Sequence, residues 1–134
     1  MHVKALGLAA VAVSLLAPLA LAHHSFAMFD ADTTTNLQGT VKEFEWINPH
    51  TWLHLTVADA SGKAVTWSLE GGGPGQLAQS GWKADTVKPG DKVTIGFHPL
   101  KDGSHGGQLL SITFPDGHSL CQGGDCRRAA GIKD

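Results

Sequence analysis

The sequence predicts an all-β protein, a small five-stranded Greek-key barrel of the OB type with one short helix between strands three and four. Apolar and polar residues alternate with a period of two along several short segments, as in half-buried strands. Turn-forming Gly, Pro, Asn and Asp residues separate these segments. A single helical segment falls in the interval where the OB-fold has its helix. A small β-sandwich is the alternative, because strand count alone does not distinguish the two architectures.

Three strands are expected in the first half of the domain, at residues 37–46, 51–58 and 64–70. On the second strand, Leu53 and Leu55 alternate with polar residues, so one face is expected to be buried. The first strand changes parity between Val41 and Phe44, which predicts a β-bulge or a strong bend.

The second half of the domain is expected to hold the helix and two more strands. The helix is predicted at residues 74–80, with Leu77 as its apolar anchor and Gly81 as its stop. The fourth strand places three apolar residues on one face, Val93, Ile95 and Phe97. A glycine-rich loop at 101–108 then leads to the last strand at 109–114.

The first residues have the features of a cleavable signal peptide. Lys4 precedes an apolar run from Ala5 to Leu21, and the run ends in the small-x-small pattern that signal peptidase recognises. We expect cleavage after Ala22, so that the mature chain begins at His23. A membrane anchor is the alternative, but Pro18 interrupts the run and no stop-transfer charges follow it.

The chain is therefore expected to consist of three regions, a signal peptide (1–22), the OB-like barrel (23–117) and a polar tail (118–134). The mature protein would be periplasmic or secreted and free of the membrane. Removal of 22 of the 134 residues leaves enough chain for one domain.

The loss of Lys4 moves the formal charge from −2 to −3, and the remaining cations are scattered. Nucleic acid is therefore excluded as an expected partner.

The tail contains both cysteines, Cys121 and Cys126. An exported chain enters an oxidising compartment, so a small disulfide loop between them is predicted. A thiolate metal site is the alternative, but the spacing differs from the common Cys-x-x-Cys pair and no second pair completes four ligands.

Histidine is the feature that separates this chain from an ordinary small barrel. Seven of the eight histidines lie in the mature chain, at positions 23, 24, 50, 54, 98, 105 and 118. Imidazole is the commonest metal ligand in proteins. Cleavage before His23 would free an α-amine beside its imidazole and next to His24. With a third histidine this nitrogen-rich set would suit Cu(II). A solvated terminus without function is the alternative.

A second group of candidate ligands lies on the second strand. His50, Trp52 and His54 are spaced by two residues and would project from one face, where two imidazoles could share a metal ion. His98, on the polar side of the fourth strand, is a further candidate metal ligand. Trp46 and Glu70, together with Trp52, are expected to contribute to a ligand-facing surface. A polar outer face that packs against a tail or a partner is the alternative.

Several motifs of the mature chain resemble a family of small exported bacterial proteins that is classed as a domain of unknown function. The motifs are His23-His24-Ser25-Phe26, Gly39-Thr40-Val41, Trp46-x-Asn48-Pro49-His50-x-Trp52, Trp67-x-x-Glu70, Gly81-Trp82 and His98-Pro99-x-x-Asp102-Gly103. The resemblance implies export and a small β-barrel, and it implies no established activity. More loosely, the expected fold and its Trp and His face resemble CusF-type periplasmic copper-binding proteins. This sequence lacks the methionine ligands of that group.

These observations predict a non-enzymatic, exported metal-binding protein that binds, delivers or buffers copper through histidines. Support for catalysis is thin, because Glu70 is a lone carboxylate, the serines lack a nucleophile elbow and the chain has no tyrosine. The alternative is a metal-independent binding or assembly module for a small molecule, a glycan or a partner protein. Such a module would expose an apolar patch near Trp46, Trp52 or Trp82.

Overall fold

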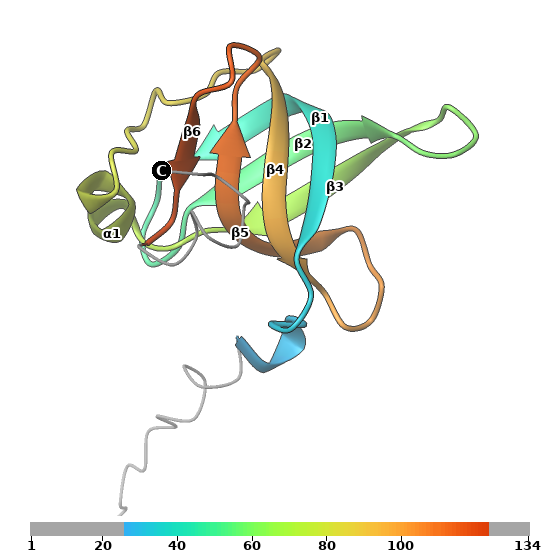
Figure 1. Ribbon diagram of the computed structural model, residues 1–134, viewed down its shortest axis with the longest axis horizontal. Helices are drawn as coiled ribbons and strands as arrows, with labels where there is room; N and C mark the ends of the chain where they lie inside the picture. Colours follow the sequence, from blue (N-terminus) through green and yellow to red (C-terminus); the bar gives the residue numbers. More distant parts are fainter. Residues whose placement is uncertain (1–25, 124–134) are drawn as a thin grey trace, which may run out of the picture.

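The computed structural model describes residues 26–123, which form one sheet of six strands, one α-helix and a single 3-10 turn (Figure 1). The elements in chain order are η2 (Phe26–Met28), β1 (Thr35–Glu45), β2 (Trp52–Ala58), β3 (Ala64–Glu70), α1 (Pro74–Gln79), β4 (Lys92–Pro99), β5 (Gly106–Thr113) and β6 (Ser119–Cys121). The expected signal peptide, His23, His24 and Cys126 lie outside the described residues. Within residues 26–123, no helix has the length and apolar character to span a bilayer.

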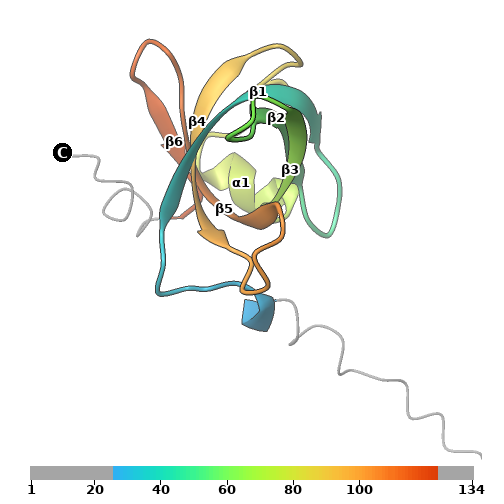
Figure 2. The same cartoon turned by 90° about the vertical axis from the view of Figure 1, so that its right-hand side faces the viewer.

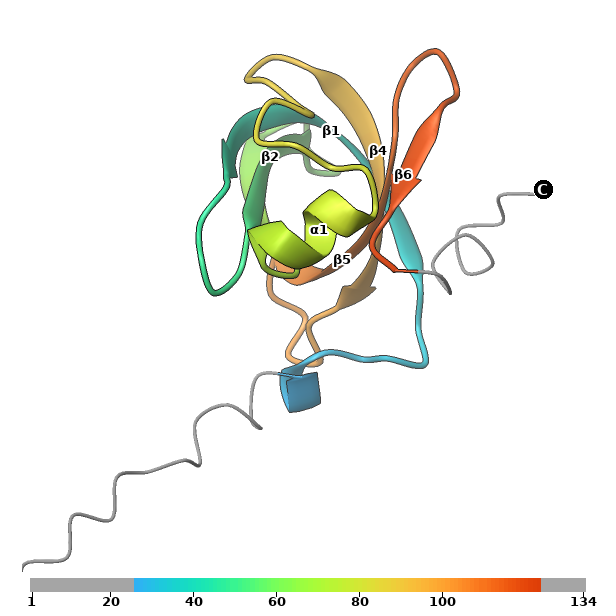
Figure 3. The ribbon, with the colours of Figure 1, turned by 90° about the vertical axis from the view of Figure 1, so that its left-hand side faces the viewer.

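The strands form a closed barrel. Their order in the sheet is β3-β2-β1-β4-β5-β6, and β3 also pairs with β5 in parallel. Figures 2 and 3 view the barrel from opposite sides, with β1 to β5 around the interior and α1 across one end. This arrangement confirms the predicted OB-like barrel with one short helix between strands three and four.

β1 is the strand that turns the sheet into a barrel. Its first part pairs with β4 through Thr35–Thr40, and its second part pairs with β2 through Thr40–Glu45. The register on β2 shifts between Val41 and Glu43, which confirms the predicted bulge. The extra residue lets one strand bend sharply enough to belong to both sides of the barrel.

The core fills the space between the barrel wall and the helix. Twelve apolar residues form one buried cluster, Val41, Leu53, Leu55, Leu69, Leu77, Trp82, Val87, Val93, Ile95, Phe97, Leu109 and Ile112. Leu77 is the one buried residue of α1, as predicted. Gly81 follows the helix with φ of 88°, a conformation that glycine adopts without strain, and Trp82 then enters the core.

The structure corrects two boundaries in the second half of the chain. β5 begins at Gly106, inside the segment expected to be a loop, because Gly106 and Gly107 pair with β3. β6 pairs with β5 from Ser119 to Cys121, so the sheet continues four residues past the expected domain end at residue 117. A strand of three residues is too short to show a periodic pattern.

Gly106 permits the parallel contact that closes the barrel, and Gly107 permits close packing of β5 against β4. A Cβ on Gly106 would lie 2.9 Å from the Ser68 carbonyl oxygen on β3, and a Cβ on Gly107 would clash with the His98 carbonyl oxygen and the Phe97 ring on β4. Any side chain at these positions would push β5 away from its neighbours.

Three aspartates stabilise tight turns by accepting backbone N–H bonds from the residue two positions later. The pairs are Asp59 with Ser61, Asp102 with Ser104 and Asp116 with His118. The Ser61 and Ser104 hydroxyls also donate to these carboxylates and are the main cause of the lowered pKa values of Asp59 and Asp102. The backbone N–H of His118 is the main cause of the lowered pKa of Asp116.

We expect Gly107→Ala to lower the free energy of unfolding by ~2–4 kcal/mol, because the added methyl overpacks the junction of β4 and β5. Gly75→Ala is the matched control. Gly75 lies in α1 with open space around its Cα, so the same change should raise stability by up to ~1 kcal/mol. Urea unfolding followed by circular dichroism measures both changes, and an equal loss in the two variants would contradict this account of the β4–β5 packing.

We also expect the carboxyl groups of Asp59, Asp102 and Asp116 to titrate below the ordinary aspartate value of 3.8. Because folding depresses these pKa values, their contribution to stability is present above the unfolded value and is lost as the pH falls through the folded value. Carbon-13 NMR titration measures each group. Ser61→Ala should raise the pKa of Asp59 alone, and titration of all three groups at 3.8 would contradict the turn geometry.

Candidate functional site

His50 and Glu70 form an imidazole–carboxylate pair at one end of the barrel. His50 precedes β2 and Glu70 ends β3, and the His50 Nδ1 lies 2.5 Å from the Glu70 Oε1. Leu69 points into the core, so the alternation along β3 turns Glu70 outward. The Glu70 side chain is nevertheless only 13% exposed, whereas the His50 side chain is 35% exposed. The pair therefore places a largely buried carboxylate behind an accessible imidazole.

A cavity of about 200 Å³ lies beside this pair. Its lining combines aromatic rings, amide side chains and glycine backbone, namely Phe26, Phe29, Pro49, His50, Glu70, Gly71, Gly72, Gly73, Gln76, Gln108 and Gln122. Gln108 lies opposite Glu70 in the parallel pairing of β3 with β5. The cavity therefore depends on barrel closure.

The glycine run of the cavity wall is fixed by hydrogen bonds. The Thr51 hydroxyl donates to the Gly72 carbonyl oxygen at 3.0 Å, and the Gly72 N–H donates to the Gln122 Oε1 at 2.8 Å. A Cβ on Gly73 would lie 2.8 Å from the Pro49 carbonyl oxygen. This close approach explains why the wall lacks side chains and why the residues before His50 are held in place.

The segment before β1 forms another wall of the cavity. Phe29 makes an isolated bridge with Leu100, and the backbone N–H of Lys101 donates to the Met28 carbonyl oxygen at 2.9 Å. These contacts place Phe26 against the cavity. His23 precedes Phe26 by three residues, although it lies outside the part of the chain that the structure describes.

The hydrogen bond to Glu70 determines which His50 nitrogen is available for a ligand. An ionised carboxylate only accepts hydrogen bonds, so neutral His50 carries its proton on Nδ1. The Nε2 lone pair is then free to bind a metal ion. Carboxylates orient many metal-binding histidines in this way.

His54 has a different environment from His50. Its Nδ1 lies 2.8 Å from the Ser68 hydroxyl oxygen and its Nε2 lies 2.9 Å from the Glu45 Oε1, so three strands contribute to this network. The Trp52 indole lies nearly parallel to the imidazole, with the centroids 6.4 Å apart. His54 would have to give up a hydrogen bond to bind a metal ion. Its role as a ligand stays a prediction.

The predicted row of His50, Trp52 and His54 on one strand face is only partly present. Trp52 and His54 share the outer face of β2, but the strand begins at Trp52 and leaves His50 in the preceding loop. Ser68 and Glu45 were not predicted as partners of His54. Only the register between strands identifies them, because they are 14 and 9 residues away along the chain.

His98 also has one ring nitrogen engaged and one available. Its Nδ1 lies 2.7 Å from the Thr33 carbonyl oxygen, which can only accept, so Nδ1 carries the proton. His98 lies on β4 opposite Gln108, one strand away from the residues that line the cavity. Like His50, it presents Nε2 for ligation, but it does not line the cavity beside His50.

The other candidate residues pack against the core or lie outside the site. Trp46 makes an edge contact with Phe44 and packs on the core, and Trp82 is 1% exposed with its Nε1–H donating to the Cys121 carbonyl oxygen. Trp82 therefore forms no part of an exposed patch. Cys121 lies on β6, and its predicted pairing with Cys126 involves a residue outside the described part of the chain.

The described histidines and acids form pairs rather than a complete ligand set. Within residues 26–123, no three His, Cys, Asp or Glu side chains come together in a group that could hold a metal ion. A metal site at His50 would need ligands from elsewhere in the chain or from solvent.

Comparison with known families matches residues 10–109 to a family of unknown function, DUF6152. The match covers most of the chain, so the protein belongs to this family. No curated protein matches the chain. The family assignment carries no activity, and the function has to be argued from the site.

We expect His50 and His98 to be in the Nδ1–H tautomer and His54 to be in the Nε2–H tautomer. Two-bond proton–nitrogen NMR correlations at pH 8 distinguish the two forms. Glu70→Gln should give His50 a mixed population without affecting His54, because an amide can donate as well as accept. Glu45→Gln should give His54 a mixed population without affecting His50. The same tautomer for His50 and His54 in the unmodified protein would contradict the hydrogen-bond assignment.

Proposed function

We propose that this member of the DUF6152 family is exported and binds one copper ion in a site made by His50 and the amino-terminal histidines His23 and His24. Its role would be copper binding, delivery or buffering without catalysis. The observation that carries the proposal is the His50–Glu70 pair, which presents an oriented imidazole at a cavity bordered by Phe26.

Chain length supports the joining of the two parts of this site. His23 precedes Phe26 by three residues, and three residues span at most about 11 Å. Phe26 and His50 line the same cavity of about 200 Å³. A connection of this length would allow the amino-terminal histidines to reach the His50 Nε2 without a domain movement or a long loop.

The chemistry of the ligand set favours Cu(II). Cleavage after Ala22 would leave the His23 amine and imidazole as a bidentate nitrogen pair, to which His50 adds another imidazole. Nitrogen ligands in a tetragonal arrangement suit Cu(II), which also binds most tightly among the divalent first-row metals. Glu70 would hold the His50 ring in its ligating tautomer and increase its basicity.

His98 is the next ligand candidate and His54 the weaker one. His98 presents an available Nε2, whereas both nitrogens of His54 are engaged by Ser68 and Glu45. The Ser68–His54–Glu45 network is best explained as a structural hydrogen-bond network that links β1, β2 and β3. Neither His54 nor Ser68 lines the cavity beside His50.

A metal-independent assembly module is the second candidate function. Phe26, Met28 and Ile47 are 60%, 48% and 49% exposed, and large apolar side chains with this exposure can contact a partner protein. Phe26 also borders the cavity beside His50. A partner docked there would compete with copper for the same end of the barrel.

We expect the processed protein to bind one Cu(II) at neutral pH. Intact mass first confirms that the chain begins at His23, and calorimetric titration then gives affinity and stoichiometry. His23→Ala and His50→Ala should each weaken binding by at least about tenfold, and Glu70→Gln should weaken it by about tenfold. Metal binding releases protons from its ligands, so the affinity should fall as the pH is lowered, because protonated imidazole cannot ligate a metal.

Two controls separate the proposed site from ordinary surface histidines. His118→Ala removes an exposed imidazole from a turn and should change the affinity by less than about twofold. Acetylation of the His23 α-amine removes that nitrogen from the ligand set and should weaken binding without altering the fold. Affinity that is insensitive to His23→Ala and His50→Ala would overturn the proposal and favour the assembly module.

A further inference from the structure

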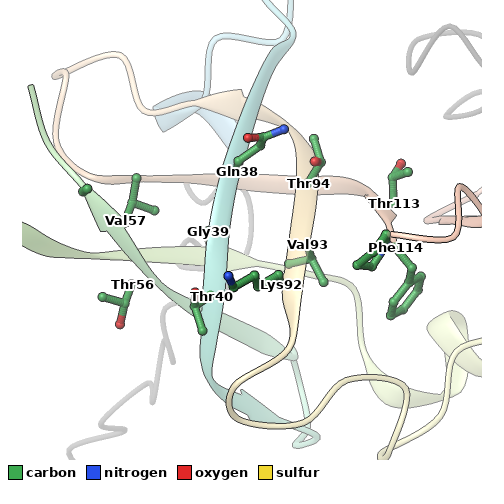
Figure 4. Close-up of a pocket in the computed structure, with 12 residues that line it drawn as sticks. Gln38, Gly39, Thr40, Thr56, Val57, Lys92, Val93, Thr94, Thr113 and Phe114 are labelled. Carbon is green, nitrogen blue, oxygen red and sulfur yellow. The ribbon is translucent and has the colours of Figure 1, made fainter.

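A second cavity lies between β1, β2, β4 and the end of β5, apart from the residues considered for the copper site. Its volume is about 480 Å³. Figure 4 shows its lining, with Thr56 and Val57 on one side of β1 and Val93, Thr94, Thr113 and Phe114 on the other. This volume is within the range of small-molecule sites in proteins. None of the residues considered for the copper site lines this cavity.

The path of β1 explains why a hollow forms here. Thr40 is the residue of β1 that pairs with both β2 and β4, opposite Thr56 and Lys92 respectively. Before Thr40, β1 follows β4 and leaves β2 without a partner on that side. Gly39 lies at this divergence, where a Cβ would be 3.0 Å from the Val57 Cγ2. The two strands thus touch at Gly39 and separate beyond it.

The chemistry of the lining is distinctive for this acidic protein. The cavity has apolar surface from Val57, Val93 and Phe114, and hydroxyl or amide groups from Gln38 and several threonines. Its only ionisable side chain is Lys92, and no Asp or Glu lines it. Among the described residues, no salt bridge involves the Lys92 ammonium. The cavity therefore offers one unpaired positive charge beside an apolar surface.

We infer that this cavity binds a small carboxylic acid with an apolar body, whose carboxylate pairs with Lys92 and whose body lies against Val57, Val93 and Phe114. A cation would be repelled by Lys92 and would find no carboxylate in the lining. A fully polar ligand would leave the apolar surface unused. This inference is independent of copper binding, because the two sites share no residue.

4-Phenylbutyrate is a suitable probe, and its primary amide is the matched neutral analogue. Both are titrated into nitrogen-15-labelled protein in the presence of a metal chelator, and amide shifts are followed by NMR. We expect saturable shifts at Gly39, Thr40 and Thr94, with the acid binding about fivefold more tightly than the amide, as a partly exposed ion pair would provide.

Lys92→Gln should remove the preference for the acid while leaving the weaker binding of the amide. Lys42→Gln is the control, because Lys42 is an exposed lysine of β1 outside the cavity lining, and it should keep the full preference. The amide spectrum of each variant shows that it is folded. Shifts that do not saturate or that fall outside the cavity, or an acid preference that survives Lys92→Gln, would overturn the inference. Neither result would bear on the copper titration.

Discussion

The parallel contact between β3 and β5 is the constraint on which the rest of the structure depends. Gly106 permits it by presenting no side chain to the Ser68 carbonyl oxygen, and Gly107 lets β5 pack closely on β4 at the same point. The contact closes the barrel and sets Gln108 opposite Glu70 at the end of β3. Glu70 in turn fixes the ring of His50. The position of the His50–Glu70 pair in the candidate metal site therefore depends on Gly106 and Gly107, which carry no functional group.

The sequence predicted the parts of the fold that leave a periodic signal. Alternation identified the first four strands, Leu77 identified the helix, and the parity change after Val41 identified the bulge. The start of β5 was missed because Gly106 and Gly107 contribute nothing to alternation. The site was less predictable than the fold. The pairings of His54 with Ser68 and Glu45 depend on the register between strands, and the sequence of one strand does not contain its register.

Histidine content alone predicted a metal-binding role, but the structure differentiates the histidines by their hydrogen bonds. His50 and His98 each use one nitrogen on an acceptor and present the other, whereas His54 uses both. The distinction arises from the neighbours of each ring and not from its exposure. It predicts that similar residues on one small barrel would have unequal capacity to bind a cation.

The bridge between Phe29 and Leu100 joins residues that are 71 positions apart, so the segment before β1 is placed by the connection between β4 and β5. Folds dominated by such distant contacts form slowly, because long loops must close before the contacts can stabilise them. The first part of the domain to be synthesised can therefore acquire its docking surface only after β4 has been made. We expect it to remain accessible to processing enzymes until the last barrel strands are in place.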